Sequence, residues 1–314
     1  MPKLTSTTRI STIGMTRDGW LAVRRKTIGG SDAAAIAGMN PYGSPYSVWA
    51  EKTGRLPERP DNEAMRQGRD LEPYVAERFE ELTGKATADE HSIIYNEVYP
   101  FAHANIDRWI VGEDAGLECK TTSVLNLHKF KNGEYPDQYY AQCVHYMAIT
   151  GATRWYLAVL VLNQGFYVYE IDRDEAEIST LMALEREFYN RLITDTAPLP
   201  DGTNATTDAI NAVYTGGNTD ITELFGRDND LDQYVEYKAE IKRIEENMEL
   251  IKQRIYLDLG DTERGVSDRY SVTWKPQTRS SFDAKRFAAD NPDVDLSDYY
   301  NAKTFRVFNI KELK

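Results

Sequence analysis

The sequence predicts an α/β fold in which helices flank a mixed central sheet. Three observations support it: helical patterns come first, strand patterns then surround one intervening helix, and a further helix closes the region before residue 198. With 314 residues, of which 41% are hydrophobic and 11% aromatic, the chain has ample material for one large domain and an appendage.

Helical spacing and capping residues organise the N-terminal part. Helices are expected at about residues 16–25, 33–37, 45–53 and 62–82. Thr16 is suited to cap the first, and Ser31, in the turn at residues 29–32, to cap the second. On the fourth helix, Glu72 shares a stripe with Val75 and Phe79, so a carboxylate on the inward face needs a partner.

Strand patterns dominate the next segment. Strands are expected at 92–97, 101–106 and 116–121, then a helix at 136–149, a hairpin from 155–162 and 166–171, and a helix at 174–193. Side chains alternate along a strand, so Glu118 and Lys120 share one face while Leu117 and Cys119 point into an apolar layer. Such a strand both builds a core and carries a site.

Composition changes after this region, and the expected domains are residues 1–198, a linker at 199–230, and a C-terminal region at 231–314. That region should contain a helix with roughly three heptads, followed by strands at 270–274 and 305–310 that pair. Its apolar heptad positions are Tyr234, Tyr237, Ile241, Ile244, Met248, Ile251 and Ile255. Three heptads are marginal for an isolated coiled coil, which favours packing within the chain or an oligomer over an independent partner surface.

Charge and cysteine content narrow the class of protein. The net charge is −13, yet the first 30 residues carry six basic side chains against Asp18, so acidity does not exclude DNA. The basic residues are Lys3, Arg9, Arg17, Arg24, Arg25 and Lys26. No apolar run has the length of a membrane span or signal peptide, which predicts a cytoplasmic protein without a membrane partner. Cys119 and Cys143 are expected to be small apolar residues without a disulfide.

Asp107, Glu118 and Lys120 are typical of a metal-dependent nuclease centre. Hydrolysis of a phosphodiester needs an activated water and neutralisation of charge on phosphorus, which two divalent ions can provide. Asp107 and Glu118 supply carboxylates, the backbone carbonyl of Cys119 a third oxygen, and Glu72 a further carboxylate from its helix. We expect Mg²⁺, with Mn²⁺ able to substitute, and Lys120 as stabiliser of transition-state charge or orienter of the water.

An isolated Glu-x-Lys pair is more often a surface salt bridge than a catalytic centre. The catalytic interpretation is favoured here because Asp107 precedes the pair by the length of a hairpin, Glu72 lies on an apolar stripe and Gln142 follows on the next helix. The histidines lack metal-ligand spacing and are interpreted as structural residues. They are His91, His103, His128 and His145.

Six ordered motifs between about residues 15 and 195 resemble the phage-lambda-type exonucleases, also called YqaJ-like viral recombinases, of the PD-(D/E)XK nuclease superfamily. The motifs are Trp20-x-x-x-Arg24, Ile28-Gly-Gly-Ser31-Asp32, Gly68-x-x-x-Glu72, Ala104-Asn-x-Asp107, Gly116-Leu-Glu118-Cys-Lys120 and Gln142-x-x-x-Tyr146. The resemblance implies a PD-(D/E)XK core, here extended by the C-terminal helix and β-hairpin.

The resemblance also implies an activity. Such an enzyme uses Mg²⁺ to digest one strand of linear duplex DNA from its 5′ end and leaves a 3′ single strand for a single-strand annealing protein. A trimeric ring around the DNA and a phage or prophage gene expressed in a bacterial host are further implications.

Residue roles carried over from the resemblance fall into two groups. Asp107 and Glu118 become metal ligands, Lys120 the catalytic lysine, Glu72 a further acid and Gln142 a helper near the water or the scissile phosphate. Arg24 and Ser31 match positions that hold the 5′-phosphate, which suits a guanidinium and a hydroxyl at a helix start.

Two positions depart from the family pattern. Arg108 stands where glycine commonly follows the motif aspartate, and Asn105 falls near a phosphate contact, so both are candidate DNA-binding residues. Two other functions fit parts of the sequence: a structure-specific endonuclease of the same superfamily, and a non-catalytic assembly module for DNA recombination.

Overall fold

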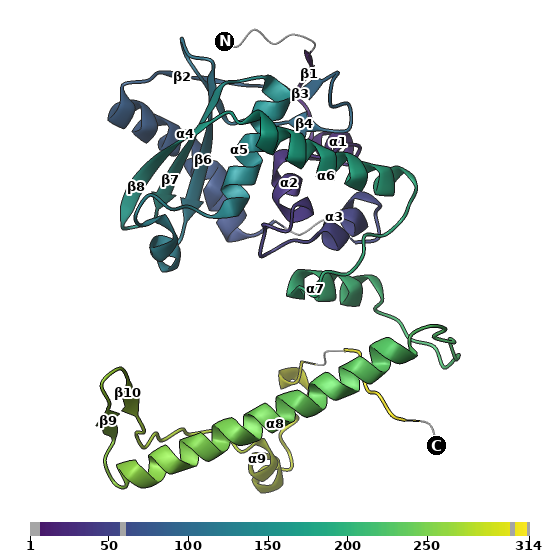
Figure 1. Ribbon diagram of the computed structural model, residues 1–314, viewed down its shortest axis with the longest axis vertical. Helices are drawn as coiled ribbons and strands as arrows, with labels where there is room; N and C mark the ends of the chain where they lie inside the picture. Colours follow the sequence, from purple (N-terminus) through teal and green to yellow (C-terminus); the bar gives the residue numbers. More distant parts are fainter. Residues whose placement is uncertain (1–6, 57–60, 302–304, 313–314) are drawn as a thin grey trace. The chain divides into compact units, whose positions relative to one another are not determined.

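The computed structural model describes residues 7–56, 61–301 and 305–312, which form two compact units, Met1–Thr215 and Gly216–Lys314 (Figure 1). Lys3, one of the basic N-terminal residues, lies outside the described part. The elements of the first unit are β1 (Thr7–Ser11), α1 (Arg17–Arg24), α2 (Gly30–Ile36), α3 (Pro45–Lys52), α4 (Glu63–Thr83), β2 (Thr87–Asp89), β3 (Ser92–Asn96), β4 (His103–Ala104), β5 (Arg108–Ile110), β6 (Ala115–Thr122), η1 (Val124–Phe130), α5 (Asp137–Thr150), β7 (Arg154–Val161), β8 (Gly165–Asp172), α6 (Glu175–Ile193) and α7 (Asn204–Val213).

A five-stranded mixed sheet forms the centre of this unit, in the order β2-β5-β6-β7-β8. Strands β6 and β7 are parallel, whereas the other neighbouring pairs are antiparallel. A parallel pair needs a crossover, and here η1 and α5 supply it. A second sheet joins β1, β3 and β4 in antiparallel pairs. The expected mixed sheet with one crossover helix is confirmed.

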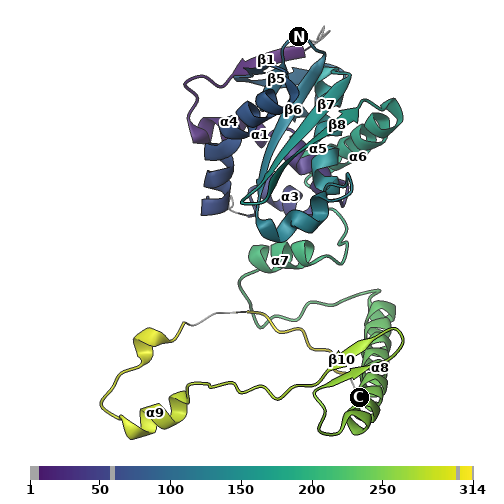
Figure 2. The ribbon, with the colours of Figure 1, turned by 90° about the vertical axis from the view of Figure 1, so that its left-hand side faces the viewer.

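The two faces of the central sheet are covered by different helices (Figure 2). Helix α4 packs on one face through Val75, Ala76 and Phe79, which meet Leu117 of β6 in an apolar cluster. Helix α5 covers the opposite face and is itself packed against α2 and α6. The alternation along β6 therefore directs Leu117 toward α4 and leaves Glu118 on the α5 side.

The helix starts expected near residues 16, 45 and 62 are confirmed, and so is the cap expected at Thr16. Thr16, Ser44 and Asn62 accept backbone hydrogen bonds as N-caps of α1, α3 and α4. The assignment of Ser31 as a cap was wrong. Helix α2 begins at Gly30 and its N-cap is Gly29, whose N–H donates to the Asp32 carboxylate at 2.9 Å.

The region expected to be a linker from residue 199 contains α7, which belongs to the first unit. Thr203 caps this helix, and Thr206 and Ala209 are buried on a helix that contacts α3. A segment rich in Thr and Asn favours loops and helix caps but can also form a short helix. Composition alone therefore placed the start of the linker too early in the chain.

The second unit contains α8 (Asp228–Leu259), β9 (Arg264–Val266), β10 (Ser271–Thr273), α9 (Ala284–Asp290) and η2 (Ser297–Tyr299). The expected pairing of residues 270–274 with 305–310 was wrong: β10 pairs with β9, because a short turn brings these adjacent segments together at little entropic cost. Residues 305–310 form no strand in the described part of the chain.

The heptad helix is confirmed as α8, with Gly260 as its C-cap. Its heptad residues from Tyr234 to Ile251 are exposed, so the described part of the unit does not cover the seam. Two aromatic contacts link α8 to later segments: Tyr256 stacks on Trp274 and Tyr234 meets Phe308 edge-on. None of the described helices is both long and apolar enough to cross a membrane.

Candidate active site

Asp107 and Glu118 meet where β5 and β6 separate. Asp107 lies immediately before β5, and its Oδ2 accepts a hydrogen bond of 2.7 Å from the backbone N–H of Cys119. Strand β5 pairs with β6 only as far as Leu117, so the edge of β6 is free at Cys119. The N–H and C=O of one strand residue point to the same edge, which turns the Cys119 carbonyl toward Asp107 as well.

Glu118 is buried, with 2% of its surface exposed, and two donors share one of its oxygens. Oε1 lies 2.5 Å from Lys120 Nζ and 2.7 Å from Gln142 Nε2. The other oxygen, Oε2, is buried without a hydrogen-bond partner among the described residues. An unpaired buried carboxylate oxygen is costly, and a cation at this oxygen would remove the cost.

Carboxylates outnumber basic groups at this centre. Burial, together with the charges of Glu118 and Glu72, raises the pKa of Asp107 well above its usual range. Burial also raises the pKa of Glu118, against the opposing effect of Lys120. Although burial disfavours its charged form, Glu118 and Asp107 raise the pKa of Lys120, which therefore remains an ammonium. Lys120 is suited to stabilise negative charge and not to accept a proton.

Glu72 reaches the centre from α4 but is held by Arg108. Nη1 of Arg108 lies 2.8 Å from Glu72 Oε1 and 2.7 Å from the Asp107 carbonyl, while its Nε lies 2.9 Å from Asp89. The Arg108 side chain is only 13% exposed. This internal position does not support the expectation that Arg108 contacts DNA.

The donor set fits a hard divalent ion. Among the described residues, no three His, Cys, Asp or Glu side chains are already arranged around one ion position. Mg²⁺ does not need such a cage, since it keeps several waters and is often bound by one or two carboxylates. Asp107, Glu118 with its unpaired oxygen, and the Cys119 carbonyl provide three oxygens of the preferred type.

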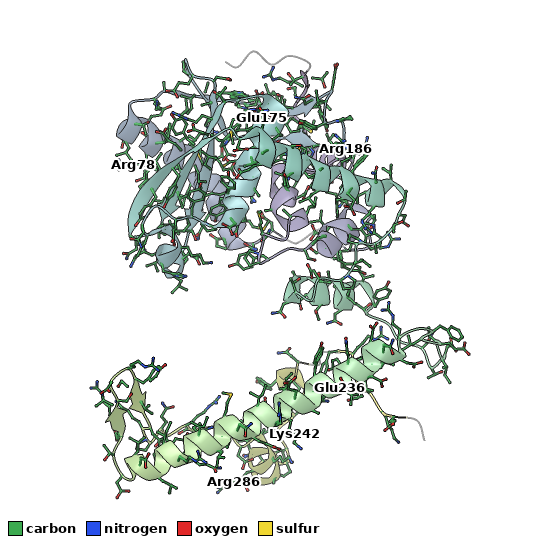
Figure 3. All side chains as sticks on the ribbon, in the orientation of Figure 1. Arg78, Glu175, Arg186, Glu236, Lys242 and Arg286 are labelled. Atoms are coloured by element: carbon green, nitrogen blue, oxygen red, sulfur yellow. The ribbon has the colours of Figure 1, made fainter. Side chains whose placement is uncertain are left out.

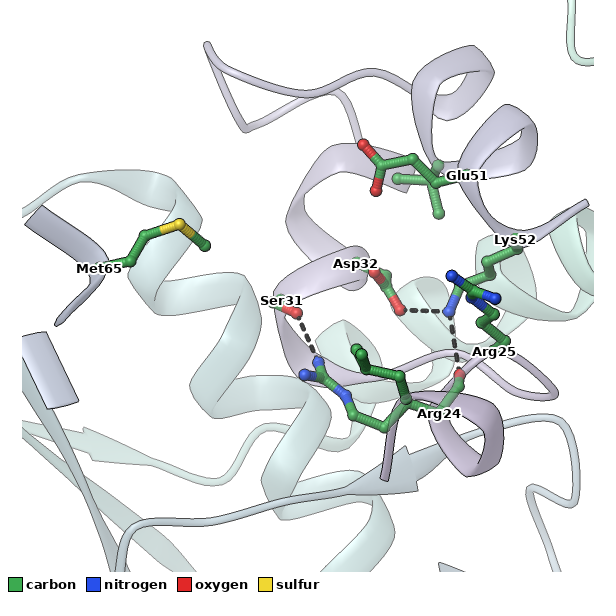
Figure 4. Close-up of a pocket in the computed structure, with 9 residues that line it drawn as sticks. Arg24, Arg25, Ser31, Asp32, Glu51, Lys52 and Met65 are labelled. Atoms are coloured by element: carbon green, nitrogen blue, oxygen red, sulfur yellow. Dashed lines mark hydrogen bonds and ion pairs between the residues drawn. The ribbon is translucent and has the colours of Figure 1, made fainter. Parts of the chain in front are cut away.

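A second group of expected residues lines a pocket of about 210 Å³ (Figure 4). Arg24 Nη2 donates to Ser31 Oγ at 3.0 Å, and the Arg24 guanidinium lies 4.2 Å from the ring centre of Trp20. Arg25 also lines the pocket. Ser31 thus contributes its hydroxyl to this pocket and does not act as the helix cap that was expected.

Asp32 and Lys52 lie in the same pocket and were missed by the sequence analysis. Lys52 Nζ is 2.7 Å from the Asp32 carboxylate and donates to the carbonyls of Thr27 and Arg24, at 2.8 and 3.3 Å. Burial would raise the pKa of Asp32, but Lys52 and Arg24 lower it to about 2. No spacing signal connects residues 32 and 52, because their meeting depends on how α2 and α3 pack.

The pocket has a positive balance. Arg24, Arg25 and Lys52 contribute three positive charges against two negative charges from Asp32 and Glu51, which leaves one positive charge among the lining residues. The Asp32–Lys52 pair is internally balanced, so Arg24 and Arg25 are left with one carboxylate, that of Glu51, and their excess positive charge can attract an anion.

A chain of buried and partly buried hydrogen bonds, completed by a cation–π contact, connects this pocket with the carboxylate centre. Gln142 Nε2 donates to Glu118 and also to the Tyr146 hydroxyl at 2.8 Å. Tyr146 donates to the Asn105 carbonyl at 2.8 Å, and the Asn105 side-chain oxygen accepts from Trp20 Nε1 at 3.3 Å. Trp20 in turn lies under Arg24.

This chain gives several residues roles that the sequence did not predict. Tyr146 was expected only as part of the motif Gln142-x-x-x-Tyr146, although this spacing of four on a helix places both side chains on one face. The Asn105 side-chain oxygen faces Trp20, so the geometry supports a structural link there more directly than a phosphate contact. The expected site residues therefore form two adjacent groups joined through α5.

Comparisons with known proteins bear on the family and on the fold. The model of the YqaJ-like viral recombinase domain matches residues 19–153. The uncharacterized protein YqaJ of Bacillus subtilis (strain 168) is 36% identical over 308 residues, which cover 95% of each chain.

Two crystal structures of LHK-Exo, an alkaline exonuclease from Laribacter hongkongensis, are similar in fold. The structure with dAMP has a TM-score of 0.51 and the other 0.50; both are 21% identical and cover 57% of this chain and 94% of the other. At this identity the likeness concerns the fold, and it confirms the expected core of a mixed central sheet flanked by helices.

Proposed function

The chain belongs to the YqaJ-like viral recombinase family, and from this premise we propose that it is a Mg²⁺-dependent exonuclease that digests the 5′-terminated strand of linear duplex DNA. Family membership and the nuclease-type fold together support a nuclease role. One observation carries the finer proposal: a carboxylate centre with an unpaired oxygen is joined by a chain of hydrogen bonds and a cation–π contact to a positively charged pocket.

Asp107, Glu118 and the Cys119 carbonyl would hold Mg²⁺, with Mn²⁺ as a substitute. The chemistry supplied by the bound ion is a more nucleophilic water and neutralisation of phosphate charge. A second ion would use Glu72, whose Oε1 is bonded by Arg108.

The protein groups have separate tasks in this proposal. Lys120, kept protonated by two carboxylates, stabilises charge that develops on the scissile phosphate. Gln142 orients Glu118 through its hydrogen bond. Arg24 and Ser31 bind the terminal 5′-phosphate. Because the pocket lies at a fixed distance from the carboxylate centre, this binding determines which phosphodiester bond is placed at Asp107 and Glu118.

The proposal extends to assembly and biological role. A homotrimer around DNA and transfer of the 3′ strand to a single-strand annealing protein follow from the family. The exposed apolar seam of α8 supports an assembly function of the second unit. The setting would be recombination by strand annealing, with a phage or prophage gene expressed in the cytoplasm of a bacterial host.

The deciding experiment uses linear duplex DNA with a 5′-phosphate on one strand only, incubated with Mg²⁺ or EDTA, beside a closed circle. The expected result is loss of the phosphorylated strand alone, only with Mg²⁺ and only from linear DNA. Cutting of the circle would instead support the endonuclease function. Absence of cleavage in every reaction would support a non-catalytic assembly module.

A further inference from the structure

Arg108 joins three elements at the edge of the carboxylate centre. It lies at the start of β5, its Nη1 bonds Glu72 of α4, and its Nε bonds Asp89 of β2. The same Nη1 bonds the carbonyl of Asp107. A planar guanidinium can make such bonds in several directions at once, which an ammonium cannot do in the same fixed geometry.

Strand register explains why Arg108 is held so firmly. Asp89 is the direct cross-strand partner of Arg108 in the antiparallel β2–β5 pair. Opposite charges on directly facing strand residues attract, and this contact fixes the arginine from the rim of the site. The inward side of the guanidinium is then presented to Glu72.

Glu72 depends on this contact for its position. Its side chain is 32% exposed and could otherwise turn into solvent, since a glutamate has several rotatable bonds. The Nη1 atom of Arg108 that bonds Glu72 Oε1 also bonds the carbonyl of Asp107, and this shared donor places the Glu72 carboxylate beside the centre. Arg108 bonds one carboxylate oxygen of Glu72, Oε1, at 2.8 Å.

We propose that Arg108 is a positioning residue of the metal centre: through its bond to Glu72 and its anchor at Asp89, it holds the α4 carboxylate where it strengthens binding of a divalent ion. This inference rests on the proposed metal-dependent function. It assigns Arg108 to the ion and not to DNA, because the guanidinium is nearly enclosed by protein groups.

Two effects oppose each other when Arg108 is removed. Loss of a positive charge favours cation binding, whereas loss of the fixed Glu72 position disfavours it. Partners that orient metal ligands are typically worth about 10- to 100-fold in metal affinity, so we expect the positional effect to dominate. Arg108→Met should therefore weaken Mn²⁺ binding about tenfold. Arg108→Lys, which can still pair with Glu72 although in a less fixed geometry, should weaken it less.

The test is calorimetric titration of Mn²⁺ into the full-length chain, with thermal unfolding as a check on folding. The variants are Arg108→Met, Arg108→Lys, Glu72→Gln and the double variant Arg108→Met/Glu72→Gln. Because Arg108 acts through Glu72, the double variant should bind no more weakly than Glu72→Gln alone. Arg78→Met is the matched control, since Arg78 pairs with Glu81 on the exposed side of α4 (Figure 3) and should leave the affinity unchanged.

Duplex affinity in EDTA gives an independent readout, which Arg108→Met should not change. Parental Mn²⁺ affinity in both Arg108 variants, tighter binding, or additive losses in the double variant would overturn the inference. If Arg108→Met does not fold, Arg108→Lys with Glu72→Gln provides the same cycle. A parental protein that binds no Mn²⁺ would overturn the proposed function itself, which is a different outcome from an ineffective Arg108 substitution.

Discussion

The Nζ atom of Lys120 lies 2.5 Å from Oε1 of Glu118, and the two side chains leave β6 on the same face. This contact accounts for two properties of the centre. It keeps Lys120 protonated at a partly buried position, and it occupies one oxygen of Glu118 while the other stays unpaired among the described residues. The lysine and the unpaired oxygen are thus placed side by side.

Lys120→Ala should lower the cleavage rate by about 10²–10³-fold, because a preorganised charge at the reacting phosphate is typically worth that much. The measurement is single-turnover cleavage of linear duplex DNA with saturating Mg²⁺, with thermal unfolding as the check on folding. Lys85→Ala removes a comparable ion pair with Glu113, away from the centre, and should cleave at the parental rate. Near-parental cleavage by Lys120→Ala would exclude the lysine from the chemistry.

Arg24→Ala should reduce the preference for a 5′-phosphorylated end. Its guanidinium bonds Ser31 and rests on Trp20, and a charged hydrogen bond to phosphate is worth about 1.5–3 kcal/mol, or roughly 10- to 100-fold. The measurement is the ratio of cleavage rates on phosphorylated and unphosphorylated ends. Arg191→Ala, which breaks a half-exposed pair with Glu187 on α6, should keep the parental ratio. Equal losses on both ends for Arg24→Ala would mean that another group senses the phosphate.

Gly30→Ala should impair both stability and cleavage. A Cβ at Gly30 would lie 2.6 and 2.9 Å from ring atoms of Tyr146 and 3.1 Å from Cγ of Gln142. These two side chains carry the hydrogen-bond chain to Glu118, and overpacking of this kind costs about 1–3 kcal/mol.

Gly68→Ala is the matched substitution, because Gly68 is also helical and its added Cβ would meet only Thr121 Oγ1, at 3.7 Å. Alanine favours a helix over glycine by about 1 kcal/mol, so this variant should be as stable as the parent or more stable. Chemical denaturation and cleavage assays of both variants provide the comparison. Equal stability of Gly30→Ala and Gly68→Ala would contradict the crowded contact.

The sequence predicted which side chains gather around Glu118 better than it predicted their surroundings. Glu118 and Lys120 are two residues apart on one strand, so alternation alone placed them together. Asp107 could be added because the chain returns to β6 within a hairpin's length. Their spacing places Gln142 and Tyr146 on one helix face. Their hydrogen-bond partners, Glu118 and Asn105, belong to other segments, so the spacing did not predict them.

Contacts that depend on tertiary packing were not predictable. Asp89 meets Arg108 through the three-residue strand β2, which is too short to give a periodic signal. Lys52 and Asp32 meet where α3 packs near α2. The expected pairing of residues 270–274 with 305–310 failed for the same reason. Residues 305–310 have the composition of a strand, but β10 pairs with β9, which is nearer in sequence.

The exposed seam of α8 allows a test of assembly. Ile244 lies in the middle of the heptads and is 47% exposed, so Ile244→Asp should remove little packing within the described chain but should disrupt contacts between copies. We expect a lower molar mass in light scattering than for the parent. Lys242→Asp, on the flank of the same helix (Figure 3), should retain the parental mass. Unchanged mass with reduced stability in Ile244→Asp would exclude the seam as an assembly surface.

His145 and Glu185 form a fully buried pair whose proton count is set by geometry. His145 Nε2 lies 2.9 Å from the His103 carbonyl, which can only accept, so this nitrogen carries a proton. Nδ1 lies 2.8 Å from Glu185 Oε1, and that contact holds one proton whichever partner carries it. Burial opposes the charge on His145, but Glu185 raises its pKa; burial raises the pKa of Glu185. The raised pKa values of His145 and Glu185 are both consistent with one proton shared between Nδ1 and Oε1.

This pair should make stability fall with rising pH. In the unfolded chain, His145 loses its second proton near pH 6.5 while Glu185 is already ionised, so above that pH the folded state holds one more proton than the unfolded state. The stabilisation is complete just below pH 6.5 and is lost as pH rises through the raised folded pKa, by roughly 1 kcal/mol per pH unit. Glu185→Gln should abolish this dependence, because an amide can donate to a neutral His145 without an extra proton.

The measurement is the free energy of unfolding of parent and Glu185→Gln from urea denaturation between pH 6 and pH 8. Taking the difference between the two proteins cancels other groups, including His103, whose pKa burial and the charge of Arg24 lower to about 3. The parent should lose its advantage over Glu185→Gln steadily across this range. Parallel pH dependences would mean that the pair holds no additional proton, and that His145 is neutral beside a carboxylate that the surrounding helices tolerate for another reason.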